Sequence, residues 1–108
     1  MSNECIFCNI IRGQSPAEFV AKKEKLVVFK DIRPMAPIHF LIVPKKHIRS
    51  INDLMPDDSE IISEMIITAK EEAKNAGISL SGYKLIFHVE RGGGQLIFHI
   101  HLHLIGGW

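Results

Sequence analysis

Three histidines near the end of the sequence, His99, His101 and His103, are separated by single apolar residues. Alternation with a period of two is typical of a β-strand rather than a helix. Because residues i, i+2 and i+4 of a strand share a face, we expect the three imidazoles to line one face. The other face would carry the apolar side chains Phe98, Ile100, Leu102 and Leu104. An imidazole acts near neutral pH as nucleophile, general base or general acid, so this face is a candidate catalytic site.

A glycine-rich segment, residues 91–95, precedes the histidines. Glycine reaches backbone conformations that other residues avoid, and successive amides of such a loop can form a concave anion-binding nest. With imidazoles that bind phosphate oxygens when protonated, the loop indicates chemistry on a phosphate group. Half-exposed histidines without a function, or a three-histidine metal centre, remain alternatives. The metal centre is awkward, because ligands on one face of a flat strand lie roughly 6.6 Å apart at ~3.3 Å rise per residue.

The elements that would position this site follow from periodicity and from glycine and proline. A short helix at residues 5–12 would end at Gly13, and strands are predicted at 19–21, 26–30, 39–43 and 83–89. Residues 31–37 are predicted to be a loop, because two prolines exclude a regular interior. We therefore expect a single α+β domain over residues 1–108, with an antiparallel sheet of about five strands and one long and one short helix on one of its faces.

The long helix is predicted at residues 55–76. Pro56 suits a first helical turn, and Asp53 would cap the helix if it began earlier. Gly77 is a plausible residue to end it. An apolar stripe at helical spacing should pack on the sheet, and it consists of Ile62, Met65, Ile66, Ala69, Ala73 and Ala76.

Composition limits the classes of protein. Thirteen basic and twelve acidic side chains give a net charge of +1, which predicts no special attraction to nucleic acid or to membranes. No apolar run approaches 18 residues, and residues 1–5 lack the basic start and long apolar segment of a secretory signal. We expect a cytoplasmic protein, and its two cysteines are too few for a disulfide framework.

Those two cysteines, Cys5 and Cys8, form a CxxC motif. A thioredoxin-like redox motif would follow a strand, and no strand precedes this one. Half of a zinc site is a better interpretation, although it needs two further ligands. The alternative is two ordinary buried thiols with a surface His47.

At this point a resemblance to a known family becomes visible. The pattern of residues 99–105, His-φ-His-φ-His-φ-φ, is followed by Gly106 and Gly107 and preceded by Gly93-Gly94-Gln95. The match continues upstream through residues 31–47, which include Asp31, His39 and the Pro-Lys-Lys-His segment ending at His47. The order and spacing resemble the histidine triad (HIT) superfamily, and within it the histidine triad nucleotide-binding (Hint) branch, over nearly the whole chain.

The resemblance implies a homodimeric nucleotide hydrolase. It implies cleavage of the P–N bond of purine nucleoside 5′-phosphoramidates, with His101 as the nucleophile that becomes a covalent nucleotidyl-histidine. His103 and His39 would contact the phosphate, and His99 would support them. The nucleotide-binding positions would be Asp31 for the ribose, Gly94 and Gln95 with neighbouring amides for the phosphate, and Phe7, Ile10, Phe29, Ile32 and Leu41 for the base. From the residues alone, Asp31 could equally cap a loop, and Phe29 and Ile32 could be core residues.

The resemblance also implies a structural zinc ion held by Cys5, Cys8, His47 and His99, whose four ligands would leave no open position for catalysis. Three features depart from the family pattern. His88 stands where an asparagine contacting the sugar-phosphate is common, and Leu96 where many members have Ser or Thr. The chain also ends at Trp108, without the longer tail of some members. The alternatives are a dinucleoside polyphosphate hydrolase and a nucleotide-binding regulatory module with little turnover.

Overall fold

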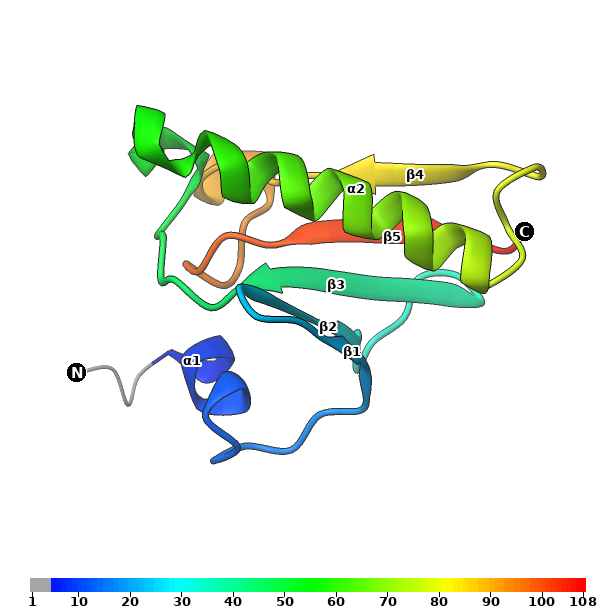
Figure 1. Ribbon diagram of the computed structural model, residues 1–108, viewed down its shortest axis with the longest axis horizontal. Helices are drawn as coiled ribbons and strands as arrows, with labels where there is room; N and C mark the ends of the chain where they lie inside the picture. Colours follow the sequence, from blue (N-terminus) through cyan, green and yellow to red (C-terminus); the bar gives the residue numbers. More distant parts are fainter. Residues whose placement is uncertain (1–4) are drawn as a thin grey trace.

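A computed structural model of the protein describes residues 5–108, so the residues that bear on a secretory signal lie largely outside the described part (Figure 1). Its helices and strands, in chain order, are α1 (Ile6–Ile11), β1 (Phe19–Lys22), β2 (Leu26–Lys30), β3 (Ile38–Pro44), α2 (Ser59–Asn75), β4 (Tyr83–Ile86) and β5 (Leu102–Gly106). Short 3₁₀ turns lie at η1 (Ile51–Asp53), η2 (Pro56–Asp58) and η3 (Arg91–Gly93). Within the described residues, no helix is both long and apolar enough to cross a membrane.

The strands form one five-stranded sheet in the order β1-β2-β3-β5-β4, and every neighbouring pair is antiparallel. This confirms the predicted fold class. β3 lies at the centre, between β2 and the strand that carries the last histidine of the triad. The first half of the chain and its C-terminal strand therefore meet in the middle of the sheet, where Leu41 pairs with His103.

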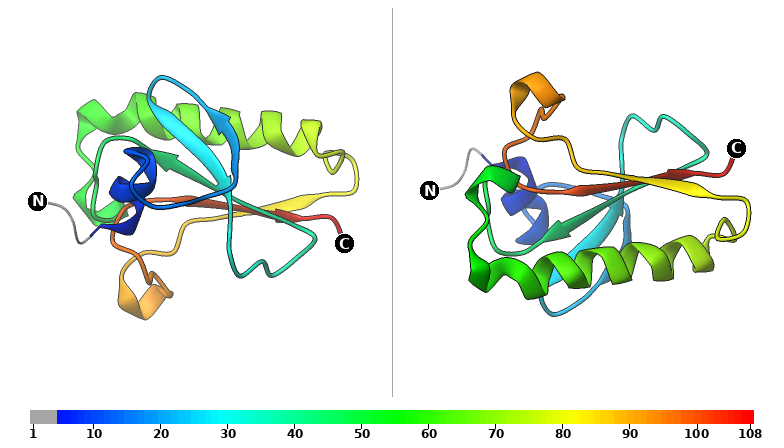
Figure 2. Two further views of the ribbon diagram at one scale, coloured as in Figure 1. Left: turned by 90° about the horizontal axis from the view of Figure 1, so that it is seen from below. Right: turned by 90° about the horizontal axis from the view of Figure 1, so that it is seen from above.

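The two helices pack on opposite faces of the sheet, which corrects the expectation that both lie on one face (Figure 2). The alternation of side chains along β2 explains this arrangement. Leu26 and Val28 join the core beneath α2, whereas Val27 and Phe29 point to the other face and pack against α1. Every one of these positions is apolar, because each face of the strand is covered by a helix.

α2 begins later than predicted. Asp53 belongs to the separate turn η1 and pairs with Arg49, while Asp58 accepts a hydrogen bond from the Met55 amide at 2.9 Å and stabilises the turn before the helix. Met65, Ala69 and Ala73 of the predicted stripe are fully buried. Ile66 is not, with 44% of its surface exposed, and Thr68 is buried in its place.

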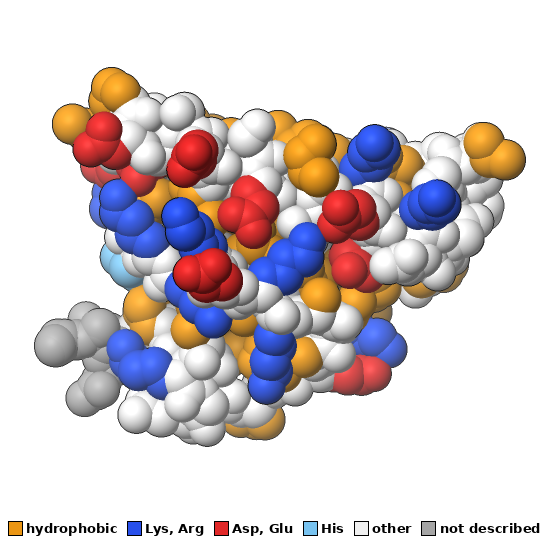
Figure 3. Space-filling view, viewed as in Figure 1, with side chains coloured by type: hydrophobic (Ala, Val, Ile, Leu, Met, Phe, Trp, Pro, Cys, Tyr) orange, Lys and Arg blue, Asp and Glu red, His pale blue; other side chains and the backbone are white. Residues whose placement is uncertain are grey.

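The surface over α2 carries acidic and basic side chains that intermingle rather than separate by sign (Figure 3). This pattern agrees with the net charge of +1. On this face there is no continuous basic surface of the kind that binds a nucleic-acid backbone.

The strand predicted to carry all three histidines is shorter than expected. β5 begins at Leu102, so only His103 lies in the regular strand, and β4 likewise ends at Ile86 rather than at residue 89. The segment before β5 instead forms a hydrogen bond with the loop after β3, since the amide of Ile100 donates to the carbonyl of Ile48 at 2.7 Å. This departure from the sheet lets the first histidine of the triad occupy a different environment from the third.

Candidate active site

A cavity of about 600 Å³ opens on the α1 side of the sheet. It is lined by α1, the ends of β2 and β3, the loop between them, the glycine-rich segment and the start of β5. Most of the predicted site residues line it: Phe7, Ile10, Phe29, Asp31, Ile32, His39, Leu41, His88, Gly94, Leu96, His101 and His103. The cavity is also lined by residues that no sequence motif marks, namely Ile6, Pro16, Ala17, Lys30, Arg33, Met35 and Ile97.

One end of the cavity is an apolar slot. Phe29 and Leu41 face it from paired positions on β2 and β3, and the ring of Phe7 meets that of Phe29 edge to face at 5.4 Å. Ile10 of α1 packs in the same cluster, and all four side chains are buried. Ile32 lies at the mouth with 88% of its surface exposed, so it is not a core residue. A flat apolar group of the size of a nucleobase fits such a slot.

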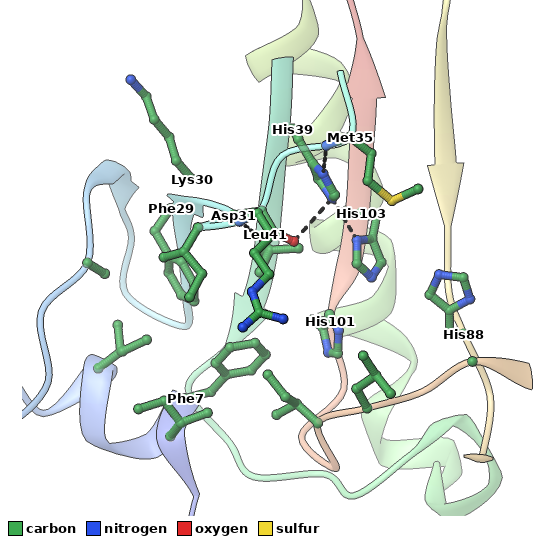
Figure 4. Close-up of a pocket in the computed structure, with 18 of the residues that line it drawn as sticks. Phe7, Phe29, Lys30, Asp31, Met35, His39, Leu41, His88, His101 and His103 are labelled. Atoms are coloured by element: carbon green, nitrogen blue, oxygen red, sulfur yellow. Dashed lines mark hydrogen bonds and ion pairs between the residues drawn. The ribbon is translucent and has the colours of Figure 1, made fainter. Parts of the chain in front are cut away.

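The tautomer of His101 is set by the backbone. Its Nδ1–H donates to the carbonyl of His99 at 2.8 Å, which leaves the lone pair on Nε2 free. The His101 ring lies between those of Phe7 and His103 (Figure 4). Burial lowers the pKa of His101, opposed by the bond to His99, so the ring is neutral near pH 7. A neutral imidazole with a free Nε2 is the form that attacks an electrophile. The edge of the Phe7 ring, 5.0 Å away between centroids, holds the imidazole in place.

A second set of hydrogen bonds orders the rings behind His101. The Met35 amide donates to Nδ1 of His39 at 3.1 Å, so the proton of that ring is on Nε2. This Nε2 lies 2.9 Å from Nδ1 of His103 and 3.3 Å from a carboxylate oxygen of Asp31. If His39 donates to His103, the remaining proton of His103 is on Nε2, and this ring becomes a hydrogen-bond donor. Burial lowers the pKa of His103 to about 4, so it donates as a neutral ring.

Asp31, His39 and His103 also have ligand atoms close enough to hold a metal ion. The hydrogen bond between the two imidazoles uses one nitrogen of each, so we interpret the group as a hydrogen-bonded chain. The Arg33 amide donates to one oxygen of Asp31 at 2.8 Å, so Asp31 does cap its loop, as the alternative interpretation of this residue predicts. The carboxylate of Asp31 also borders the cavity, beside the side chains of Phe29 and Leu41 (Figure 4).

The glycine-rich segment does not form the expected anion nest. The amides of Gly93, Gly94 and Gln95 donate to the carbonyls of Glu90 and Arg91 at 3.0 Å and close a tight turn. Gln95 is 2% exposed and lies outside the cavity, so the structure does not place it among the nucleotide-binding residues. Its side chain instead braces the turn, donating to the carbonyls of Arg49 and Ile97 and accepting from the Glu90 amide.

Gly94 contributes space rather than an amide. Its φ of +93° favours glycine, and a Cβ there would lie 3.2 Å from Nδ1 of His88. The His88 ring fits into this space, donates from Nδ1 to the carbonyl of Gly93 at 2.9 Å, and meets the His103 ring edge to face at 5.0 Å. A fourth imidazole thus joins the cavity beside the last histidine of the triad.

His99 faces away from the cavity and joins a second cluster with Cys5, Cys8 and His47. Nδ1 of His99 lies 3.3 Å from Sγ of Cys5, 3.6 Å from Sγ of Cys8 and 3.2 Å from Nδ1 of His47. In a tetrahedron with metal–N bonds of ~2.1 Å and metal–S bonds of ~2.3 Å, the ligand atoms would be about 3.4–3.8 Å apart, close to the distances found here. The Nε2–H of His99 donates to the Pro44 carbonyl at 2.8 Å, which keeps Nδ1 free as a ligand atom.

The cluster can therefore hold a tetrahedral metal ion with four protein ligands. Its donor set, two thiols and two imidazole nitrogens, is one that zinc prefers. The cluster is joined to the cavity through His99, whose carbonyl holds His101. It is also joined through Phe7, which lies between the two cysteines in sequence and lines the cavity.

Comparison with known proteins agrees with this geometry. A family model described as "Scavenger mRNA decapping enzyme C-term binding" matches residues 4–107. Purine nucleoside phosphoramidase of Escherichia coli K12 is 40% identical over 107 residues, covering 99% of this chain and 90% of the relative. A HIT family hydrolase from Legionella pneumophila is 50% identical with a TM-score of 0.96, covering 97% of this chain and 94% of the other.

A zinc-bound histidine triad family protein from Mycobacterium smegmatis has the same fold, with 28% identity and a TM-score of 0.86. That match covers 100% of this chain and 78% of the other. The similarity to these relatives spans both the histidine motif and the upstream strands that build the cavity. The chain thus belongs to the histidine triad superfamily and is similar to its nucleotide hydrolases.

Proposed function

We propose that the protein hydrolyses the P–N bond of purine nucleoside 5′-phosphoramidates through a covalent nucleotidyl-histidine on His101. The observation that carries this proposal is the hydrogen bond from His101 Nδ1–H to the His99 carbonyl, which leaves Nε2 as a nucleophile in the cavity. The activity of the E. coli relative, a purine nucleoside phosphoramidase, supports the choice of substrate.

The reaction would proceed in two displacements at phosphorus. In the first, Nε2 of His101 bonds to the phosphorus, the P–N bond to the amine breaks, and the amine leaves with an added proton. In the second, a water oxygen bonds to the phosphorus, the bond to His101 breaks, and nucleoside monophosphate is released. The neutral His103 would donate a hydrogen bond to a phosphate oxygen on which charge develops, with His39 fixing its tautomer.

Recognition of the nucleoside would use the apolar slot and the carboxylate next to it. A purine ring would pack against the apolar side chains of α1, β2 and β3 that line the cavity. Asp31 would accept hydrogen bonds from the ribose hydroxyls. The slot carries few polar groups, so binding would depend on the flat apolar area of the base more than on its edge.

We further propose that Cys5, Cys8, His47 and His99 hold a structural zinc ion. The spacing of the four ligand atoms and the fixed tautomer of His99 support this assignment, as does the zinc-bound relative. Zinc with four protein ligands has no position for water or substrate, so it would stabilise the fold rather than take part in the reaction.

A homodimer in the cytoplasm is the expected state. β4 is an edge strand, and Leu85 on it is 38% exposed, so the sheet offers an edge to which a second copy could pair. Sedimentation of the purified protein tests the dimer.

Release of AMP from adenosine 5′-phosphoramidate tests the function. The native protein should release AMP, and His101→Ala should reduce the rate by at least about 1000-fold, because it removes the imidazole that forms the covalent intermediate. The same variant should still bind AMP, which controls for folding. Mass spectrometry of the native protein quenched during turnover should detect the nucleotidyl adduct on His101.

The outcomes separate the alternatives. Turnover of diadenosine polyphosphates with no turnover of phosphoramidates would favour the polyphosphate hydrolase. Binding of AMP without turnover of either substrate would favour a regulatory module. Turnover that survives in His101→Ala would contradict the assignment of the nucleophile.

A further inference from the structure

We propose that His88 is a further catalytic residue, the acid that protonates the leaving amine and the base that then takes a proton from water. The inference rests on the proposed function and assigns the proton transfers that the reaction needs. Amines are poor leaving groups unless they are protonated, so P–N cleavage requires such a donor.

The position of His88 carries the proposal. Its ring lies beyond His101 and His103 as seen from Phe7 and Phe29 (Figure 4). If the apolar slot holds the nucleoside, the displaced group must occupy the other part of the cavity, which His88 borders. In a displacement at phosphorus the attacking and leaving atoms are roughly in line, so the amine points away from His101.

The orientation of the ring supports the same role. His88 donates from Nδ1 to the Gly93 carbonyl, which leaves Nε2 as the atom that can give or take a proton. Among the described residues no group forms a hydrogen bond with this Nε2. Gly94 keeps room for the ring, because any side chain at residue 94 would press against Nδ1 of His88.

The other imidazoles of the cavity are less suited to donate the proton. His39 and His103 are hydrogen-bonded to each other, and burial lowers the pKa of both rings. They are therefore neutral near pH 7, and the N–H of a neutral imidazole is too weak an acid to protonate an amine. His101 cannot donate the proton either, because its Nε2 bonds to the phosphorus in the same step.

The remaining side chains that line the cavity are not suited to protonate the leaving amine in place of His88. Lys30 forms an ion pair with Glu18 at 2.7 Å, and the Arg33 guanidinium suits the binding of anions rather than proton transfer. Asp31 lies on the nucleoside side, next to His39. Leu96, which also lines the cavity, has no proton to give.

The proton balance closes over the two steps. As the P–N bond breaks and the bond from phosphorus to His101 forms, the Nε2 proton of His88 moves to the amine nitrogen. Neutral His88 then accepts a proton from the attacking water while the water oxygen bonds to phosphorus and the bond to His101 breaks. The proton taken from water thus replaces the one given to the amine, and His88 is ready for a further turnover.

Two variants and two substrates test the proposal. His88→Asn can still donate to the Gly93 carbonyl, and His88→Phe keeps a flat ring against His103, but neither side chain transfers a proton. An adenosine 5′-(N-alkyl)phosphoramidate needs protonation of its leaving group, whereas the p-nitrophenyl ester of AMP releases a stable anion. The value of kcat/KM reports the first displacement for both substrates.

We expect both variants to lose about 100-fold or more in kcat/KM on the alkylphosphoramidate and less than about tenfold on the nitrophenyl ester. The ester is also the control for folding. Equal losses on the two substrates, or no loss on the alkylphosphoramidate, would overturn the role of His88 and leave the proposed function intact. A native protein that cleaves neither substrate would overturn both.

Discussion

At the scale of single residues, the hydrogen bond made by one nitrogen of an imidazole determines what the other can do. The chain has six histidines, of which four line the cavity and two join the cysteine cluster. His101 and His99 both donate to a backbone carbonyl, yet one presents its free nitrogen to the cavity and the other to the cysteines. Identical residue types two positions apart thus acquire different chemistry from their partners.

Asp31 provides a prediction at this scale. We expect 2′,3′-dideoxy-AMP to bind about tenfold more weakly than AMP, because it removes hydroxyls that a carboxylate would accept. Calorimetry on the native protein measures the difference. Asp31→Asn should reduce this discrimination, and its affinity for the dideoxy nucleotide serves as the control. Equal affinity of the native protein for the two nucleotides would rule out a ribose contact.

At the scale of elements, the glycine-rich turn is held in place by Glu90. This residue has a φ of 63°, which is costly for a residue with a side chain. Its carboxylate accepts hydrogen bonds from Arg49, Ser50 and Asn52, and these bonds hold its pKa at about 2. The glycine-rich turn supplies the Gly93 carbonyl, which orients the His88 ring. An ionised carboxylate outside the cavity therefore positions a ring inside it.

The substitution Glu90→Gln tests whether the hydrogen bonds to the Glu90 carboxylate, here called the Glu90 clamp, hold the glycine-rich turn in place. The amide loses the charge and one acceptor oxygen, so the turn should loosen and kcat/KM for the phosphoramidate should fall by up to about 100-fold. Asp53→Asn is the matched control, because Asp53 pairs with the same Arg49 but does not contact the glycine-rich turn. Steady-state kinetics and thermal melting of both variants measure the effect. Equal activities of the two variants would show that the clamp does not position the site.

At the scale of the whole molecule, the cysteine cluster joins segments that are distant in the sequence. α1 and the residue before it carry two ligands, the loop after β3 carries the third, and the segment before β5 carries the fourth. α1 also contributes Phe7 and Ile10 to the base slot. A metal ion there would fix the short helix against the sheet and shape the cavity at the same time.

Removal of the metal is the prediction at this scale. The purified protein should contain zinc, and a chelator should lower both its melting temperature and its affinity for AMP. Each kcal/mol of lost stability would lower the melting temperature by roughly 4–8 °C. Cys5→Ser should reduce the bound zinc and show a smaller response to the chelator. Elemental analysis that finds no zinc in freshly prepared protein would contradict the assignment.

Local patterns in the sequence were sufficient for the fold class and for most of the cavity. Beta-forming residues and the positions of glycine and proline predicted most of the strands, and β2 (Leu26–Lys30) lies where it is expected. The family resemblance that the two separated motifs carry identified twelve residues that line the cavity. These features depend on spacing along the chain, because a side chain's direction on a strand follows from its position. Family membership likewise followed from the motifs and their order.

Only the tertiary structure decided which partners those side chains meet. It put α1 and α2 on opposite faces, turned His99 away from His101 and His103, and withdrew Gln95 from the cavity. It also used the amides of the glycine-rich turn within the turn itself. Apart from the bonds within the turn, these outcomes depend on contacts between residues far apart in sequence, such as the packing of Val27 and Phe29 against α1 and the hydrogen bond from Ile100 to Ile48. No local periodicity encodes such contacts. Spacing along the chain thus determined which residues could do chemistry, whereas long-range contacts determined which chemistry each can do.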